Sequence, residues 1–140
     1  MRAETGFTYV LDGELRILVT DDDPIMREFA TVYLGAPTVT IETADCGEAG
    51  LARLESEPFD LAMIDIDMPG IDGYEMLRRI RANPRLRGLP VVVVTSNEDI
   101  ASIDRAYRLG ATSFATKPVN WRLLAYQLRF VLRAGQRLAA

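Results

Sequence analysis

Two short apolar segments that run directly into aspartates constrain the fold of this chain most. Residues 15–20 are followed by three consecutive aspartates, and residues 61–64 are followed by Asp65-Ile66-Asp67. Apolar runs of this length that end at polar residues are typical of strands buried on both faces of a parallel sheet. The carboxylates are therefore expected at the C-terminal ends of two strands.

The position of these aspartates predicts a cation site. In open doubly wound sheets, ligands bind beyond the carboxyl ends of the strands, so Asp21, Asp22 and Asp65 are expected to converge there. Close carboxylates repel one another and cannot all stay ionised unless a cation lies between them. The chain has no histidine and one cysteine, and oxygen ligands alone favour Mg²⁺ over zinc or copper. The pattern predicts phosphate chemistry with Mg²⁺.

Composition limits the classes of protein to consider. The 140 residues, of which 49% are hydrophobic, predict one globular domain. A net charge of −4 argues against direct binding to nucleic acid or to an acidic membrane. No membrane-spanning stretch and no signal peptide are recognised, so a cytoplasmic location is expected. Cys46 is expected to be a small, partly buried thiol, and any phosphohistidine must come from another protein.

Strands alternate with helices five times along the chain. The expected strands are residues 15–20, 39–43, 61–64, 91–94 and 113–115. The expected helices follow Asp23-Pro24, span about 47–57, begin near Asp72, follow Asn97 or Asp99, and span 120–137. This alternation predicts an α/β doubly wound parallel sheet covered on both faces.

Apolar spacing predicts which helix faces are buried. For the first four helices in chain order, the apolar residues at helical spacing, which we expect on the buried face, are as follows: Ile25, Phe29 and Val32; Ala49, Leu51, Ala52 and Leu54; Met76, Leu77 and Ile80; and Ile100, Ile103 and Tyr107.

Four motifs in order resemble the receiver domain of two-component response regulators. They are Val19-Thr20-Asp21-Asp22, Asp65-Ile66-Asp67-Met68-Pro69-Gly70-Ile71-Asp72-Gly73, Val94-Thr95-Ser96 and Lys117-Pro118. The resemblance covers residues 14–135 and implies a flavodoxin-like (βα)5 sheet with strand order 2-1-3-4-5. We therefore expect an N-terminal extension over residues 1–13 and a receiver domain with an extended C-terminal helix over residues 14–140.

The resemblance also implies a role for each site residue. The domain would take a phosphoryl group from a sensor histidine kinase or a histidine phosphotransfer protein and switch the surface of its fourth helix, fifth strand and last helix. The implied roles are phospho-acceptor for Asp65; Mg²⁺ ligands for Asp21, Asp22, Asp65 and the backbone carbonyl of Asp67; phosphoryl contacts for Thr95 and Lys117; and the switch for Thr95 and Phe114. Phe114 stands where the family often has a hydroxylated aromatic residue, so only its packing can signal.

Two other functions fit parts of the sequence. Asp65-Ile66-Asp67 has the Asp-x-Asp form of haloacid-dehalogenase-type phosphohydrolases, although those enzymes place the nucleophile on the first strand. A receiver-like interaction module that is not phosphorylated would usually lack Asp65, Lys117 or the acidic pair. Asp23 and Asp72 are interpreted as helix N-caps.

The last helix suggests an output. Trp121, Leu124, Leu128 and Val131 form one packing stripe, and a line of arginines (Arg122, Arg129, Arg133 and Arg137) lies on another face. Leu124, Leu128, Val131, Gly135 and Leu138 also follow the a/d spacing of a short coiled coil, which predicts a homodimer through this helix. The segment resembles receivers fused to diguanylate cyclase (GGDEF) domains, so a downstream output domain is expected.

Overall fold

The computed structural model describes residues 9–139, with side chains as far as Gly135. Five strands alternate with five helices along the chain. The strands are β1 (Leu15–Thr20), β2 (Val39–Ala44), β3 (Leu61–Asp65), β4 (Val91–Thr95) and β5 (Ser113–Thr116). The helices are α2 (Pro24–Leu34), α3 (Gly47–Ser56), α4 (Gly73–Ala82), α5 (Ile100–Arg108) and α6 (Trp121–Ala139).

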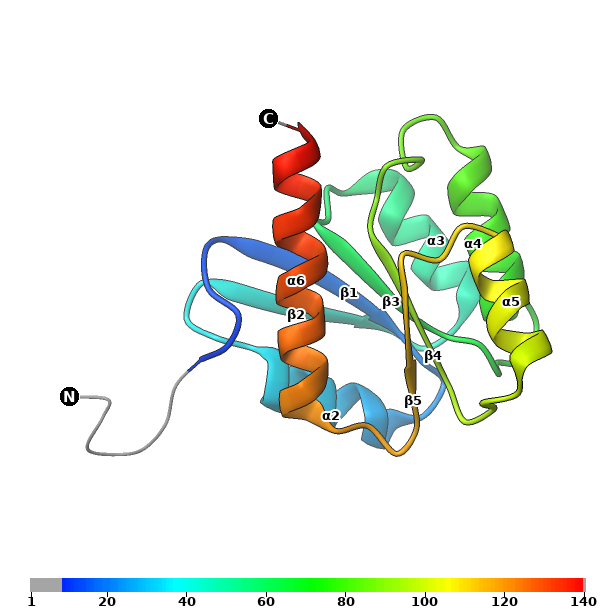
Figure 1. The fold of residues 1–140 in the computed structure, drawn as a ribbon, viewed down its shortest axis with the longest axis horizontal. Coiled ribbons are helices and arrows are strands. Elements are labelled where there is room, and N and C mark those ends of the chain that lie inside the picture. Colours follow the sequence, from blue (N-terminus) through cyan, green and yellow to red (C-terminus); the bar gives the residue numbers. More distant parts are fainter. Residues whose placement is uncertain (1–8, 140) are drawn as a thin grey trace.

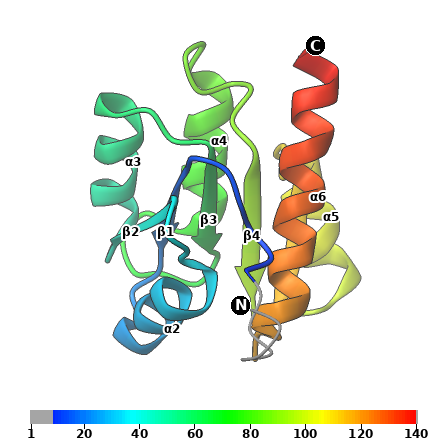
Figure 2. The same ribbon diagram turned by 90° about the vertical axis from the view of Figure 1, so that its left-hand side faces the viewer.

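All strands are parallel, in the order β2-β1-β3-β4-β5, which confirms the predicted doubly wound sheet (Figure 1). Figure 2 shows the sheet between helices α3 and α4 on one side and α6 on the other. Two apolar clusters fill these layers, one containing Ile17, Met63 and Leu128, the other Ile64 and Ile80.

Polar side chains start the helices where the sequence predicts. Asp23, Asp72 and Asp99 accept hydrogen bonds from backbone amides in the first turns of α2, α4 and α5. Cys46 is partly buried, and its sulfur accepts a hydrogen bond from the Ala49 amide at the start of α3. Asn120 Oδ1 accepts one from the Leu123 amide in α6. These caps satisfy backbone donors that have no partner within the helix.

The predicted buried face of α2 is wrong. Ile25 is 62% exposed and Val32 is 61% exposed, and Phe29 is also exposed. Ala30 and Leu34 are buried instead. The sequence has apolar residues on two faces of this helix, and spacing alone cannot tell which of them meets the sheet.

The other helix faces follow the prediction to different degrees. Met76, Leu77 and Ile80 are buried in α4, and Leu51 and Leu54 are buried in α3. Ala49 is partly buried, whereas Ala52 is exposed. In α5, Ala106 is the one buried residue, and Ile100 and Tyr107 are exposed.

The packing stripe of α6 is confirmed, and it accounts for the coiled-coil spacing. Leu124, Leu128 and Val131 are buried against the sheet, so this part of the predicted seam faces the chain's own core, whereas Gly135 is exposed. Leu123 and Phe130 are exposed on the outer side. The side chains of Arg137 and Leu138 lie outside the described residues.

The segment before β1 contributes to the core. Leu11 is buried and Val10 packs on the same apolar cluster, although both residues fall within the expected N-terminal extension. Among residues 9–139, no helix has both the length and the apolar character needed to cross a membrane.

Candidate phosphoryl-acceptor site

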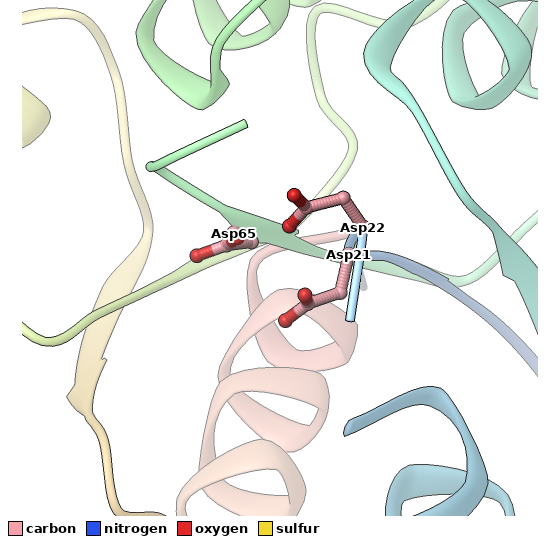
Figure 3. A group of neighbouring side chains, drawn as sticks. All are labelled: Asp21, Asp22 and Asp65. Atoms are coloured by element: carbon pink, nitrogen blue, oxygen red, sulfur yellow. The ribbon is translucent and has the colours of Figure 1, made fainter. Parts of the chain in front are cut away.

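The carboxylates after β1 and β3 meet at one edge of the sheet. These strands are adjacent and parallel, with Thr20 paired to Ile64, so Asp21 and Asp65 follow side by side. Asp21, Asp22 and Asp65 each place a carboxylate oxygen within 4.8 Å of the others (Figure 3). The expected convergence is confirmed.

Burial of this cluster is uneven. Asp21 is 2% exposed and Asp65 is 4% exposed, whereas Asp22 is exposed. Burial, together with the nearby negative charge of Asp21, raises the pKa of Asp65 to about 6, although Lys117 opposes this shift. The unmodified site therefore holds a carboxylate whose charge is costly to maintain.

Lys117 is the cation that pairs with the two buried carboxylates. Its Nζ lies 3.1 Å from Asp21 Oδ2 and 3.2 Å from Asp65 Oδ1. Its backbone amide donates to the carbonyl of Thr95, which ties the end of β5 to the end of β4. Burial lowers the pKa of the Lys117 ammonium, but the charges of the two carboxylates outweigh it and the net shift is upward.

Several contacts that involve backbone groups hold Asp21 and Asp65 in place. The Asp23 amide donates to Asp21 Oδ1 at 2.9 Å, and Arg27 Nη1 donates to the Asp21 carbonyl oxygen at 2.8 Å. The Asp67 amide lies 3.4 Å from Asp65 Oδ1, and the side chain of Asp67 is exposed and outside the cluster. The contact of Arg27 was not predicted, because no motif marks an arginine that reaches a carbonyl six residues earlier in the chain.

The donor set fits a hard divalent cation. Three carboxylates cluster here, and one ammonium group contacts two of them, so negative charge is in excess in this cluster. Oxygen ligands with part of the coordination left to water are the usual environment of Mg²⁺ in proteins. The exposure of Asp22 leaves this side of the cluster open to solvent.

Thr95 and Phe114 lie on the same face of the sheet. Thr95 ends β4 beside Thr116 of β5, and Phe114 stands two residues earlier on β5, opposite Val93. Thr95 is buried, with its Oγ1 accepting a hydrogen bond from the Asn97 amide at 3.0 Å. Phe114 is partly buried and packs on the cluster beneath α3, α4 and α5. Thr95 and Phe114 are thus two residues apart in register on one face of the sheet.

Known proteins resemble the chain over most of its length. The model of the "Response regulator receiver domain" family matches residues 17–129. "Transcriptional regulatory protein AfsQ1" of Streptomyces coelicolor is 36% identical over 121 residues, covering 86% of this chain and 52% of that protein. "Heme response regulator HssR" of Staphylococcus epidermidis is 29% identical over 122 residues, covering 87% and 53%. The chain thus spans about half the length of these curated relatives.

Solved structures share the fold. A CheY-like receiver domain protein from Methanospirillum hungatei has a TM-score of 0.82 and 28% identity, covering 89% of this chain and 98% of that one. Chemotaxis protein CheY4 of Vibrio cholerae has a TM-score of 0.80 and 25% identity, covering 85% and 99%.

Proposed function

Because this chain belongs to the response regulator receiver domain family, we propose that Asp65 accepts a phosphoryl group from a sensor histidine kinase or a histidine phosphotransfer protein. The observation that carries the proposal is the buried carboxylate of Asp65 at the end of β3, beside Asp21, Asp22 and Lys117. A carboxylate oxygen of Asp65 would attack phosphorus while the bond between phosphorus and the donor's imidazole nitrogen breaks. The electron pair of that bond returns to the imidazole.

The negative charges of acceptor and donor oppose this reaction. Asp21, Asp22 and Asp65, with the backbone carbonyl of Asp67, would hold Mg²⁺, which when bound neutralises charge between the carboxylate and the incoming phosphoryl group. Lys117 already contacts the acceptor, so its ammonium needs only a small movement to pair with a phosphoryl oxygen. Self-catalysed phosphorylation and dephosphorylation by these residues are part of the proposal.

The phosphorylated site would be sensed by Thr95 and Phe114. The Thr95 hydroxyl would donate a hydrogen bond to a phosphoryl oxygen, which draws it toward Asp65. Phe114 lies on the same face, and its ring would move into the space that Thr95 leaves. This change would alter the surface formed by α5, β5 and α6. In chain order these are the fourth helix, the fifth strand and the last helix, the surface expected from the sequence.

The exposed side of α2 supports a protein as the phosphoryl donor. Ile25, Phe29 and Val32 face outward on the helix that begins three residues after Asp21. An apolar row beside a reaction site gives a partner protein a surface to pack against. A small phosphodonor would not use it.

The phosphohydrolase alternative is not favoured. Asp65 ends the third strand of a sheet with order 2-1-3-4-5, whereas the nucleophile of those hydrolases follows the first strand. An unphosphorylated module is also less well supported, because Asp21, Asp22 and Asp65 are all present in one cluster and Lys117 contacts two of them.

The outer face of α6 supports a further interaction. Leu123 is 63% exposed and Phe130 is 73% exposed, seven residues apart and therefore on the same side of the helix. We propose that this face, rather than the buried a/d seam, forms the expected homodimer contact. Sedimentation with and without beryllofluoride tests it: a dimer should weaken in Phe130→Glu, and a chain that stays monomeric throughout would refute it.

An output domain controlled through α6 is also part of the proposal. One relative is by its name a transcriptional regulator, whereas residues 117–121 and the last helix resemble GGDEF-fused receivers. The type of output domain stays a prediction.

Intact mass spectrometry after incubation with acetyl phosphate and Mg²⁺ tests the proposed function. The wild-type chain should gain one phosphoryl group, and Asp65→Asn should gain none. An equal adduct on both proteins would refute the assignment of Asp65.

A further inference from the structure

Helix α5 is attached to the domain through little buried surface. Ala106 is the one buried residue among the nine of this helix, and Ile100 is 72% exposed. Burial of apolar surface normally supplies most of the free energy that holds a helix on a sheet. The polar and aromatic contacts of α5 therefore carry an unusually large share of its attachment.

Two of these contacts come from Tyr74, in the first turn of α4. The Tyr74 hydroxyl donates to the carbonyl oxygen of Ser102 at 3.3 Å. The guanidinium of Arg105 lies 4.0 Å from the centroid of the Tyr74 ring, within the range of a cation–π interaction. We call this pair of interactions the Tyr74 contact. It joins α4 to Ser102 and Arg105 of α5.

The α4 side of this contact is fixed close to Asp65. Gly73 precedes Tyr74, and its amide donates to the carbonyl oxygen of Ile66. A Cβ atom at Gly73 would lie 2.5 Å from the Asp65 carbonyl oxygen, so α4 begins directly on the backbone that follows β3. Tyr74 is thus placed by the same segment that carries the phosphoryl acceptor.

The other connection to α5 starts at Thr95. Thr95 Oγ1 accepts from the Asn97 amide, and Asn97 Oδ1 accepts from the Asp99 amide at 3.2 Å. Asp99 Oδ1 then accepts from the Ser102 amide at 2.6 Å. This series of hydrogen bonds, the Thr95–Ser102 series, ends at the residue whose carbonyl oxygen receives the Tyr74 hydroxyl. Ser102 is therefore connected both to the Thr95 hydroxyl, through this series, and to α4, through Tyr74.

We propose that Tyr74 is a positioning residue that holds α5 in the place it has when Asp65 is unmodified. Displacement of Thr95 toward a phosphorylated Asp65 is transmitted to α5 through Asn97 and Asp99, against the Tyr74 contact. This inference rests on the proposed function. Removing the contact destabilises the unmodified position, so it increases affinity for any ligand that prefers the displaced one.

The first test measures the apparent Kd for beryllofluoride with Mg²⁺ present. Tyr74→Phe removes the hydroxyl donor and keeps the ring, and Tyr107→Phe makes the same chemical change at an exposed position of α5. Tyr74→Phe should bind about two- to tenfold tighter than wild type, the range expected for one hydrogen bond of ordinary strength. Tyr107→Phe should match wild type. Equal or weaker binding by Tyr74→Phe would overturn the proposal.

The same titration separates this inference from the proposed function. A wild-type chain that binds no beryllofluoride would contradict the phosphoryl site itself. A wild-type chain that binds it, with Tyr74→Phe and Tyr107→Phe alike, would contradict only the role of Tyr74.

The second test follows the backbone amides of α5 by NMR. Asn97→Ala removes the acceptor for the Asp99 amide and leaves Tyr74, Thr95 and the acidic residues unchanged. Beryllofluoride should still bind, but the shifts of the α5 amides on binding should be smaller than in wild type. Unchanged shifts would show that the Thr95–Ser102 series does not transmit the displacement.

Discussion

The ammonium nitrogen of Lys117 lies 3.2 Å from a carboxylate oxygen of Asp65 in the unmodified protein. The same nitrogen contacts Asp21 at 3.1 Å, so one cation bridges two buried anions. The proposal assigns Mg²⁺ to the same two carboxylates.

Replacing Asp65 should stabilise the metal-free domain at neutral pH. Its folded pKa of about 6 lies above the ordinary value, so between these values the folded state binds more protons than the unfolded state. The free energy of unfolding contributed by this group therefore falls as pH rises from about 4 to about 6. Asp65→Asn removes the cost and should gain about 2 to 3 kcal/mol at pH 7 in urea unfolding with a chelator.

The gain should disappear below about pH 4, where Asp65 is protonated in both states. Asp104→Asn, at an exposed position of α5, serves as the control and should change stability little at either pH. An Asp65→Asn domain that is less stable than wild type at neutral pH would contradict the raised pKa.

Asp22 should contribute to Mg²⁺ affinity although it is exposed. Asp22→Asn removes one of three clustered charges, and we expect at least about tenfold weaker Mg²⁺ binding by calorimetry. Asp23→Asn is the matched control, since asparagine also caps a helix and Asp23 lies outside the cluster. Equal affinities in the two variants would place the cation elsewhere.

Lys117 should compete with Mg²⁺ for the buried carboxylates. Lys117→Met removes the positive charge 3.1 Å from Asp21, so Mg²⁺ should bind several-fold tighter at about pH 8.5, where Asp65 is ionised. Arg79→Met, which loses an exposed cation on α4, should not change the affinity. Weaker Mg²⁺ binding in Lys117→Met would mean that the lysine organises the carboxylates instead of competing for them.

The acidic site could be predicted from the sequence because parallel strands deliver their C-terminal residues to one edge. Asp21 and Asp65 need only follow neighbouring strands to meet, and the strand order was implied by the resemblance. The bridge from Lys117 to Asp21 could not be predicted. It depends on where the chain turns after β5, at the far side of β3 and β4 in strand order.

Helix faces were the least predictable part of the fold. In α2, Ile25 and Phe29 have helical spacing, but so do Ala30 and Leu34, and only packing decides which pair is buried. In α6, the spacing of Leu124, Leu128 and Val131 matches a coiled coil and a sheet-covering face equally well. Helical period identifies a face without identifying what covers it.

The exposed apolar residues of α2 should affect the rate of phosphoryl transfer from a protein donor but not from a small-molecule donor. Phe29→Ser should slow transfer from a phosphorylated histidine kinase that serves the wild-type chain, by about tenfold if the residue is central to the contact. Phosphorylation by acetyl phosphate should be unchanged, which shows that the site is intact. Leu123→Ser, at another exposed apolar position on α6, is the control. If Phe29→Ser slows phosphorylation by both donors equally, the substitution has damaged the site itself.

The identity of the residue that carries the phosphoryl group tests the proposed function most directly. An aspartyl phosphate is an acyl phosphate, so borohydride reduces it to an alcohol and converts the residue to homoserine. After treatment with acetyl phosphate, Mg²⁺ and borohydride, peptide sequencing by mass spectrometry should find homoserine at position 65 alone. Homoserine at Asp21, Asp22 or Asp67, or an unmodified Asp65 in a chain that carries phosphate, would contradict it.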